Sequence, residues 1–439
     1  MHPARQTSGG RRQSLFRLAF AALIVVVLAG VYLVYRHEGQ HRIGAAGHGH
    51  SRRVTSKHSL GPNAGPGRGR AKTGSPLNPD WRGNGNAVTL AFGGDVHFEG
   101  ELGVRLGDDP STALDGNIAS LLSGADLSMT NFESALVSGP CPDPQPKQFV
   151  FSAPKTALTA FKAAHVTVVT EANNHGEDCG RAGLTESLAL AKAAGYPVLG
   201  IGKDAAQAFA PYETKINGQR IAIIAATEVI DTNLITAWTA TATQPGLASA
   251  YQEAELVSAV QRARKDNDTV VVYLHWGTEA QTCPNSVQEP LAKALVKAGA
   301  DIIIGAHAHV QLGAGYLGTA FVDYGLGNLA FYDTTPPETY SGALHITITG
   351  RHIDGFKWRP AEINDGLPVP ETGSDATAAI ERWKGLRGCT DLALAPGTTL
   401  ATAQSETRPF AGPFIRPLGD PPGGSPGTTQ KAARASRDS

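Results

Sequence analysis

The stretch that decides the fold reads Ala172-Asn173-Asn174-His175-Gly176-Glu177-Asp178. It follows an apolar run, residues 166–170, whose β-branched residues predict a buried strand. A strand that ends on Asn-Asn-His presents an amide oxygen and an imidazole at its carboxyl end. Open α/β sheets bind their ligands at that edge. The stretch therefore predicts an α/β sheet with a polar site at one edge.

Four other apolar runs are followed by the same kinds of side chain. The polar residues are Asp95 and His97 after residues 88–92, Asn131 and Glu133 after 127–129, His275 after 269–274, and His307 and His309 after 301–305. In Asp-x-His and His-x-His the two side chains lie on one face of an extended segment. We expect these strand ends to converge on a single site.

Carboxylates and neutral imidazoles together are the ligands that a pair of divalent cations needs. The expected metal ligands are Asp95, His97, Glu133, Asn174, His275, His307 and His309. These donors suffice for two ions and leave positions open for water and substrate. Taken alone, His275 is more often a core histidine and Asn173-Asn174 a turn. Their recurrence after successive strands favours the metal site.

The order of the elements predicts the architecture. Strands alternate with helices up to residue 305, and consecutive strands follow, which indicates an α/β layer fold. Helices are expected over residues 112–122, 156–164, 185–194, 253–264, 288–298 and 375–386. Asn217-Gly218 lies between two β-rich runs and predicts a hairpin.

The chain ends differ in composition from the middle. Residues 18–35 are apolar throughout, and as a helix they would span about 27 Å. A signal-peptide core is shorter and has a nearby cleavage site, so we expect an uncleaved transmembrane anchor after a short N-terminus, residues 1–17. Arginines flank the anchor on both sides and leave its orientation open. We then expect a flexible linker (36–86), the main domain (87–365), a C-terminal extension (366–411) and a disordered tail (412–439).

Charge and cysteine content exclude some functions. The formal net charge is −1, from 38 basic and 39 acidic residues, so broad electrostatic binding to nucleic acid is not expected. The four cysteines form no CxxC motif, which speaks against a zinc knuckle. Disulfides between them would suit a protein outside the cytoplasm, and four buried thiols are an equally good interpretation. If they are oxidised, three pairings are open.

Taken together, the motifs resemble a known family. Gly94-Asp95-x-His97, Asn174-His175 and His307-x-His309 are similar to the calcineurin-like metallophosphoesterase pattern. Asn131-Phe132-Glu133, His275-Trp276-Gly277-x-Glu279 and Tyr324-Gly325-Leu326-Gly327-Asn328 resemble the CapA family more specifically. CapA proteins are membrane-anchored factors of capsule and poly-γ-glutamate synthesis. The resemblance covers about residues 87–345 and implies a four-layer α/β/β/α sandwich on a single transmembrane helix, with the domain outside the cell.

The resemblance also implies roles for the site residues. Asp95, His97 and His309 would hold one ion, Asn174, His275 and His307 would hold the second, and Glu133 would bridge them. His175 would be the general acid of metal-assisted phosphoester hydrolysis. Asn131, Glu279 and Asn328 would contact the substrate or support the ligands. The two cations would be Mn, Fe or Zn. Two departures from the family are Ala306-His307-Ala308, where His-His-Pro is common, and the presence of His97, which many members lack.

The implied partners are membrane lipid, a polymer synthase complex, and an anionic polymer or phosphoester substrate. Two alternatives remain. The domain could be a non-catalytic subunit that binds the polymer or its synthase, or it could be a general extracellular metallophosphoesterase. His97 and His175 favour catalysis, because a binding module needs no proton donor.

Overall fold

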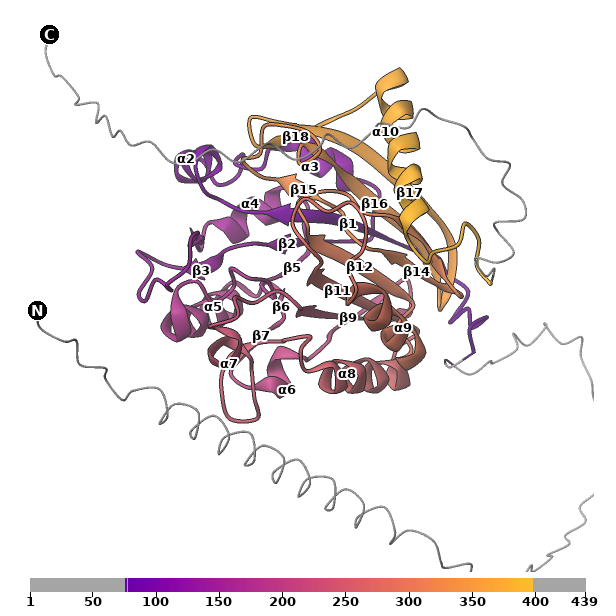
Figure 1. The fold of residues 1–439 in the computed structure, drawn as a ribbon, viewed down its shortest axis with the longest axis horizontal. Coiled ribbons are helices and arrows are strands. Elements are labelled where there is room, and N and C mark those ends of the chain that lie inside the picture. The colour runs from indigo at the N-terminus through magenta and orange to yellow at the C-terminus, as the bar shows by residue number, and fades with distance from the viewer. Residues whose placement is uncertain (1–75, 77, 398–439) are drawn as a thin grey trace, which may run out of the picture. The chain divides into compact units, whose positions relative to one another are not determined.

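The computed structural model describes residue 76 and residues 78–397 (Figure 1). The expected anchor at residues 18–35 and the expected tail at 412–439 lie outside the described residues. Within the described part, no helix combines the length and apolar character needed to cross a bilayer.

The first sheet has eight strands. Its order is β18 (Leu367–Pro370), β17 (His352–Asn364), β16 (Tyr340–Thr349), β1 (Val88–Val96), β2 (Leu127–Phe132), β5 (Val168–Thr170) and β6 (Val198–Leu199), and β15 (Asn328–Ala330) pairs with β1. Strands β1, β2, β5 and β6 run parallel. Their carboxyl ends therefore share one edge.

The second sheet has six strands, in the order β13 (Ala314–Leu317), β14 (Ala320–Asp323), β12 (Ile302–His307), β11 (Thr269–Trp276), β9 (Gln219–Thr227) and β8 (Tyr212–Ile216). Strands β9, β11, β12 and β14 are parallel. Two short ribbons pair β7 (Ile201–Gly202) with β10 (Gly246–Leu247), and β3 (Ala135–Val137) with β4 (Ser152–Pro154).

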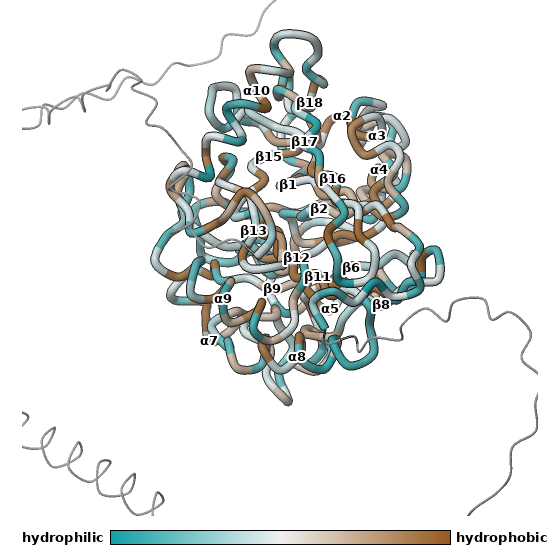
Figure 2. Tube along the Cα trace, turned by 90° about the vertical axis from the view of Figure 1, so that its right-hand side faces the viewer, coloured by the Kyte–Doolittle hydropathy of each residue, from teal (hydrophilic) through white to brown (hydrophobic). Residues whose placement is uncertain are grey.

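The two sheets pack face to face. Alternate residues of β1, such as Leu90 and Phe92, share one core with Val271 and Tyr273 of β11. The opposite face of β1, at Ala91, packs against α2 (Glu101–Asp108), α3 (Asp115–Leu122) and α4 (Ala157–Ala163). The outer face of the second sheet packs against α8 (Glu253–Asp266) and α9 (Gln288–Ala298). Figure 2 shows hydrophobic residues along the inner strands and hydrophilic ones on the peripheral loops. The predicted α/β class is confirmed.

The remaining helices are α5 (Gly180–Ala194), α6 (Ala205–Ala208), α7 (Ile235–Trp238), α10 (Gly373–Gly385) and the 3-10 turn η1 (Leu386–Cys389). Trp383 of α10 stacks on Trp358 of β17, with ring centroids 5.3 Å apart. Since β18 pairs with β17, the described part of the expected C-terminal extension is continuous with the main domain.

The end of the expected linker is also held by the fold. The Asn84 and Asn86 side-chain amides donate to the Asn217 carbonyl oxygen at 2.9 and 2.8 Å. The Arg351 backbone N–H donates to the Trp81 carbonyl oxygen at 2.7 Å. We expected residues 78–86 to belong to the linker because they lack apolar periodicity. Polar contacts hold them instead, and such contacts do not require apolar residues at regular spacing.

Local differences from the sequence predictions have simple causes. The predicted Asn217-Gly218 hairpin is confirmed, with positive φ at both residues and Ile216 opposite Gln219. Helix α5 begins at Gly180, five residues before the predicted start, and α2 was not predicted because two glycines interrupt it. Strand β1 continues past residue 92 to include Asp95, across a register shift. Gly94 permits this, since a Cβ there would lie 1.7 Å from the Gly327 carbonyl oxygen.

Candidate metal centre

The predicted strand-end residues meet at the carboxyl edge that the two sheets share. The Asp95 carboxylate, at the end of β1, accepts a hydrogen bond from the His307 backbone N–H at the end of β12, at 3.0 Å. His309 Nδ1 lies 3.6 Å from Asp95 Oδ2, and His309 Nε2 lies 3.7 Å from Glu133 Oε1. Asp95 and His307, which lie 212 positions apart in the chain, are therefore neighbours in one cluster.

Two groups of three residues hold donor atoms within 4.8 Å of one another. One consists of Asp95, Glu133 and His309, and the other of Glu279, His307 and His309. Because His309 belongs to both, the two groups are adjacent. Glu279, which the sequence assigned to substrate contact or ligand support, thus lies close enough to be a ligand itself.

Asn174 and His275 form a separate contact in the same region. Asn174 Oδ1 lies 2.7 Å from His275 Nε2, so the amide and imidazole predicted to share an ion are in direct contact. The ring centroids of His275 and His307 are 4.7 Å apart. This places all three predicted ligands of the second ion close together.

His97 is packed differently from the other predicted ligands. Its fully buried ring stacks on Phe331 at 4.0 Å between centroids and meets Tyr332 edge-on at 4.5 Å. Neither group of mutually close donors contains it. Its role as a metal ligand stays a prediction.

Asn131 lies at the middle of the cluster. Its amide nitrogen donates to Asp95 Oδ1 at 2.8 Å and to Glu133 Oε2 at 3.3 Å, and it lies 3.2 Å from His275 Nδ1. Its oxygen accepts from the Asn173 side chain at 2.9 Å. The first Asn of Asn-Asn-His therefore orients Asn131, which in turn orients three expected ligands.

Asn328 supports the cluster from the other side. Its Oδ1 lies 2.8 Å from His309 Nδ1, and its amide nitrogen donates to Asp333 Oδ2 at 2.9 Å. It also donates to the Glu338 carbonyl oxygen at 3.1 Å. The contact restrains the orientation of the His309 ring, and the role of Asn328 in supporting a ligand stays a prediction.

Burial sets the protonation of these groups. It lowers the pKa of both His97 and His307 to about 3, and it lowers the pKa of His275 well below its usual value. All three imidazoles are then neutral at pH 7, which is the form that binds metals. Burial, reinforced by nearby Asp95, raises the pKa of Glu133 well above its usual value. A bound cation would relieve this cost of keeping two buried carboxylates charged.

The unsatisfied atoms of the cluster fit a cation. Both ring nitrogens of His97, Glu133 Oε1 and His307 Nδ1 are buried and have no hydrogen-bond partner among the described residues. Buried polar atoms are normally paired. His307 and His309 also have φ of 95° and 56°, a region that costs non-glycine residues about 1–3 kcal/mol. Nitrogen and carboxylate donors suit divalent Mn, Fe or Zn.

His175 faces the cluster through one nitrogen and is held through the other. Its Nδ1 lies 2.6 Å from Asp178 Oδ2, and its Nε2 lies 3.9 Å from Glu133 Oε1. Phe151 stacks on the ring at 4.0 Å between centroids. Nε2 is therefore the nitrogen available to exchange a proton at the cluster.

Sequence reasoning missed two residues that hold His175. Lys147 Nζ lies 2.8 Å from Asp178 Oδ1, and it also donates to the Asn174 carbonyl oxygen. Its side chain is 6% exposed. The sequence could have indicated Asp178, because this carboxylate lies only three positions after His175. Lys147 carries no signal of its own, because it comes from a loop 28 residues upstream.

Disulfides tie two loops to this region. Cys141 pairs with Cys179, and Cys283 pairs with Cys389, which decides the pairing that the sequence left open. The first bridge joins the Lys147 loop to the residue after Asp178. The second joins the loop after Glu279 to the end of the described chain.

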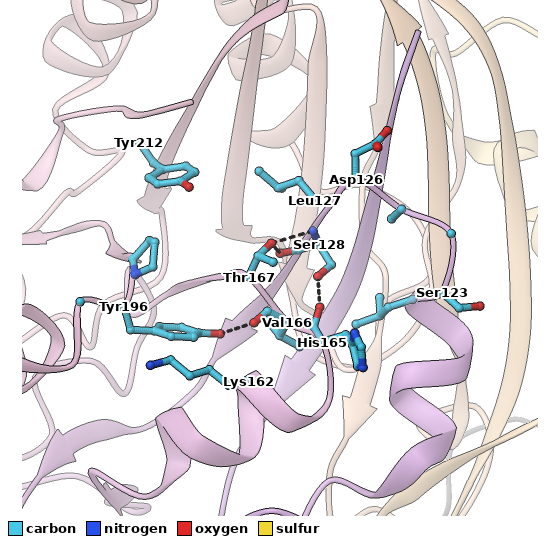
Figure 3. A pocket seen from close by; sticks show the side chains of 15 residues that line it. Ser123, Asp126, Leu127, Ser128, Lys162, His165, Val166, Thr167, Tyr196 and Tyr212 are labelled. Atoms are coloured by element: carbon cyan, nitrogen blue, oxygen red, sulfur yellow. Dashed lines mark hydrogen bonds between the residues drawn. The ribbon is translucent and has the colours of Figure 1, made fainter. Parts of the chain in front are cut away.

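A cavity of about 220 Å³ opens onto the cluster. It is lined by Phe149, Phe151, His175, Glu279, Ala280, His309, Phe331, Tyr332, Asp333 and Glu338. A larger cavity, about 560 Å³, lies at the opposite edge, where β2, β5 and β6 begin (Figure 3). None of the residues predicted for the site lines that larger cavity.

Comparisons with solved structures give only distant likenesses. A novel phosphatase from Mycoplasma pneumoniae aligns with a TM-score of 0.39 and 15% identity, over 67% of this chain and 97% of that one. The NAD nucleotidase of Haemophilus influenzae aligns with a TM-score of 0.38 and 13% identity, over 73% of this chain and 68% of its own.

Sequence comparisons are more specific. The chain is 34% identical over 234 residues to the capsule biosynthesis protein CapA of Bacillus anthracis, covering 52% of this chain and 55% of that protein. It is 27% identical over 254 residues to the PGA biosynthesis protein CapA of Bacillus subtilis, covering 58% of this chain and 66% of that protein. The chain thus spans between half and two thirds of these relatives. The model of the bacterial capsule synthesis protein family PGA_cap matches residues 89–333, more than half of the chain. The chain belongs to the bacterial capsule synthesis protein family.

Proposed function

We propose that this chain is a metal-dependent phosphoester hydrolase that acts in the synthesis or export of an anionic capsule polymer of the poly-γ-glutamate type. The observation that carries the proposal is the convergence of neutral imidazoles and carboxylates beside His175. Several of their buried polar atoms have no hydrogen-bond partner in the part of the chain that the structure describes. The family membership supports the role in capsule formation.

The residues would divide the work as follows. Asp95, Glu133 and His309 would hold one cation, and His307, His275 and Asn174, joined by Glu279, would hold the other. Two divalent cations, when bound, supply Lewis acidity and lower the pKa of water at the site. Asn131 and Asn328 keep the ligands oriented. Asp178 holds His175 so that its Nε2 can give a proton to the leaving oxygen.

The location is part of the proposal. Residues 18–35 would anchor the chain in the cell membrane by a single pass, with the domain outside and a polymer synthase complex as its partner. Both disulfides suit that side of the membrane, since such bonds persist in oxidising surroundings. Protease added to intact cells should then degrade the domain. Complete protection until the cells are lysed would refute this topology.

Metal content and hydrolysis test the catalytic role. The purified full-length chain, loaded with Mn²⁺, should bind two ions and hydrolyse an aryl phosphodiester. Asn174→Ala should lower the metal content or affinity. A chain that binds metal but hydrolyses no phosphoester would contradict the proposal. The family role would then rest on binding the polymer or its synthase.

A further inference from the structure

The cavity above the metal centre has unusually exposed aromatic walls. Phe149 is 52% exposed and Tyr332 is 44% exposed, and both line this cavity. Phe151 and Phe331 form its deeper walls and lie beside the His97 ring. Large exposed aromatic side chains gathered in one concave place indicate contact with a ligand.

The charged groups of the same cavity are carboxylates. Asp333 and Glu338 line it and are not among the proposed metal ligands, whereas Glu279 lines it and is one of them. Among the described residues, no Lys or Arg lines this cavity. The pKa of Asp333 is raised mainly by burial, and the negative charges of Glu338 and Glu279 also raise it, so these carboxylates affect one another. The nearby cation Lys147 is already paired with Asp178 and Asp231. An anionic group would therefore be repelled everywhere except at the metals.

The inner end of the cavity lies beside Glu133, which is not itself one of the lining residues. His175 and His309 form part of the lining, and Glu133 Oε1 lies 3.9 Å from His175 Nε2 and 3.7 Å from His309 Nε2. This oxygen is fully buried and has no hydrogen-bond partner among the described residues. The proposed function assigns Glu133 to a cation, so the groups of the cavity that remain for a further ligand are Asp333 and Glu338 with the aromatic walls.

We propose that this cavity is a subsite for an ammonium group, so that the substrate carries a positively charged amine close to the anionic group held by the metals. The inference rests on the proposed hydrolase function. Aromatic faces attract ammonium ions through their quadrupole, and the carboxylates add direct charge attraction. A polyanionic chain would then reach the metals by an amine-bearing end and not by its middle.

Matched ligands test the subsite in the Mn²⁺-loaded full-length chain. 2-Aminoethyl phosphate and propyl phosphate have similar size and differ in the positive charge, and 2-carboxyethyl phosphate carries a negative charge instead. Calorimetry should show that the aminoethyl compound binds about tenfold more tightly than the propyl compound, and that the carboxyethyl compound binds least tightly. Equal affinities, or a preference for the carboxyethyl compound, would overturn the proposal.

Two variants test which side chains cause the preference for 2-aminoethyl phosphate. Glu338→Gln removes a charge and Tyr332→Leu removes an aromatic face, and each should reduce the aminoethyl preference about threefold while propyl phosphate binding stays the same. Glu381→Gln, on the exposed face of α10, is the control and should change nothing. Loss of affinity for propyl phosphate as well would show that a variant damages the anion site, and would count against the assigned role.

Hydrolysis of an aryl phosphodiester is measured on the same samples. A persistent aminoethyl preference without hydrolysis would refute the hydrolase and keep the subsite. Hydrolysis without the preference would keep the hydrolase and refute the subsite. No affinity for any of the three phosphates together with no hydrolysis of the diester would overturn both.

Discussion

A cavity lies at each edge of the parallel strands, and the smaller of these two adjoins the candidate metal centre. At the amino edge, the cavity of about 560 Å³ has several of its polar side chains in hydrogen bonds. Thr167 Oγ1 donates to the Ser128 carbonyl oxygen at 2.7 Å, and the Tyr196 hydroxyl donates to the Val166 carbonyl oxygen at 2.6 Å (Figure 3). No residue lining it has a buried polar side-chain atom without a partner, within the described chain.

The carboxyl edge shows the opposite condition. Its cavity is about 220 Å³, yet the neighbouring cluster contains buried atoms of His97, Glu133 and His307 that no described residue pairs with. Unpaired buried polar atoms are costly, so they persist where a ligand satisfies them. Buried polar atoms without partners therefore indicate a functional cavity better than the volume of the cavity does.

The largest effect is expected at His175. His175→Ala should lower turnover of a substrate with a poor leaving group by about 10²–10⁴-fold, because the proton donor is lost. An aryl phosphodiester should be affected much less, since its leaving group needs little protonation. Metal content and melting temperature should be retained. If His175 is only a packed core residue, the melting temperature falls and all substrates slow alike.

A smaller effect is expected at Asn131. This residue would orient the metal ligands without binding the metal itself. Asn131→Ala should weaken metal binding about 10–100-fold, because it removes the amide that orients Asp95, Glu133 and His275. Competition with a metallochromic chelator measures the affinity. The matched change at the amino edge is Ser128→Ala, which should leave metal affinity as it is. Equal losses of metal affinity in both variants would contradict a specific role of the carboxyl edge in metal binding.

A pH effect on stability is expected from another buried carboxyl, Asp323, at the end of β14. Burial raises its pKa from 3.8 to about 8 in the folded chain. The folded state then keeps a proton that the unfolded chain releases above pH 4, so stability is full below that pH and falls as pH rises toward 8. The slope is at most about 1.4 kcal/mol per pH unit. Urea unfolding should show a flatter slope for Asp323→Asn.

The control for that experiment is Asp126→Asn, an exposed aspartate at the amino edge. It should leave the pH slope of the wild-type chain in place. An unchanged slope in Asp323→Asn would mean that the Asp323 carboxyl is already ionised at neutral pH.

The smallest effect is expected at the amino-edge cavity itself. Lys162→Ala removes a cation that lies 5.6 Å from the Tyr196 ring centroid. Hydrolysis and metal content should remain at wild-type values, because the cavity lies at the opposite ends of the strands from the candidate metal centre. A loss of activity with unchanged stability would show that this cavity also serves the reaction.

The sequence by itself determined the α/β class, most helices, the Asn217-Gly218 hairpin and the polar strand ends. These features are local, since periodicity and turn chemistry are set by residues a few positions apart. Once parallel strands are recognised, their carboxyl ends must meet, so the convergence of Asp95, His275 and His309 was also predictable.

Only the tertiary structure decided which side chains touch within that edge. Three contacts arise from strand ends and loops that meet across long stretches of chain: the pairing of Lys147 with Asp178, the position of Asn131 among three expected ligands, and the closeness of Glu279 to His307. No local pattern encodes such contacts, because they depend on how both sheets pack and on which cysteines pair. Burial follows from the same packing. It leaves the imidazoles neutral and the carboxylates close together, which makes the edge suitable for cations.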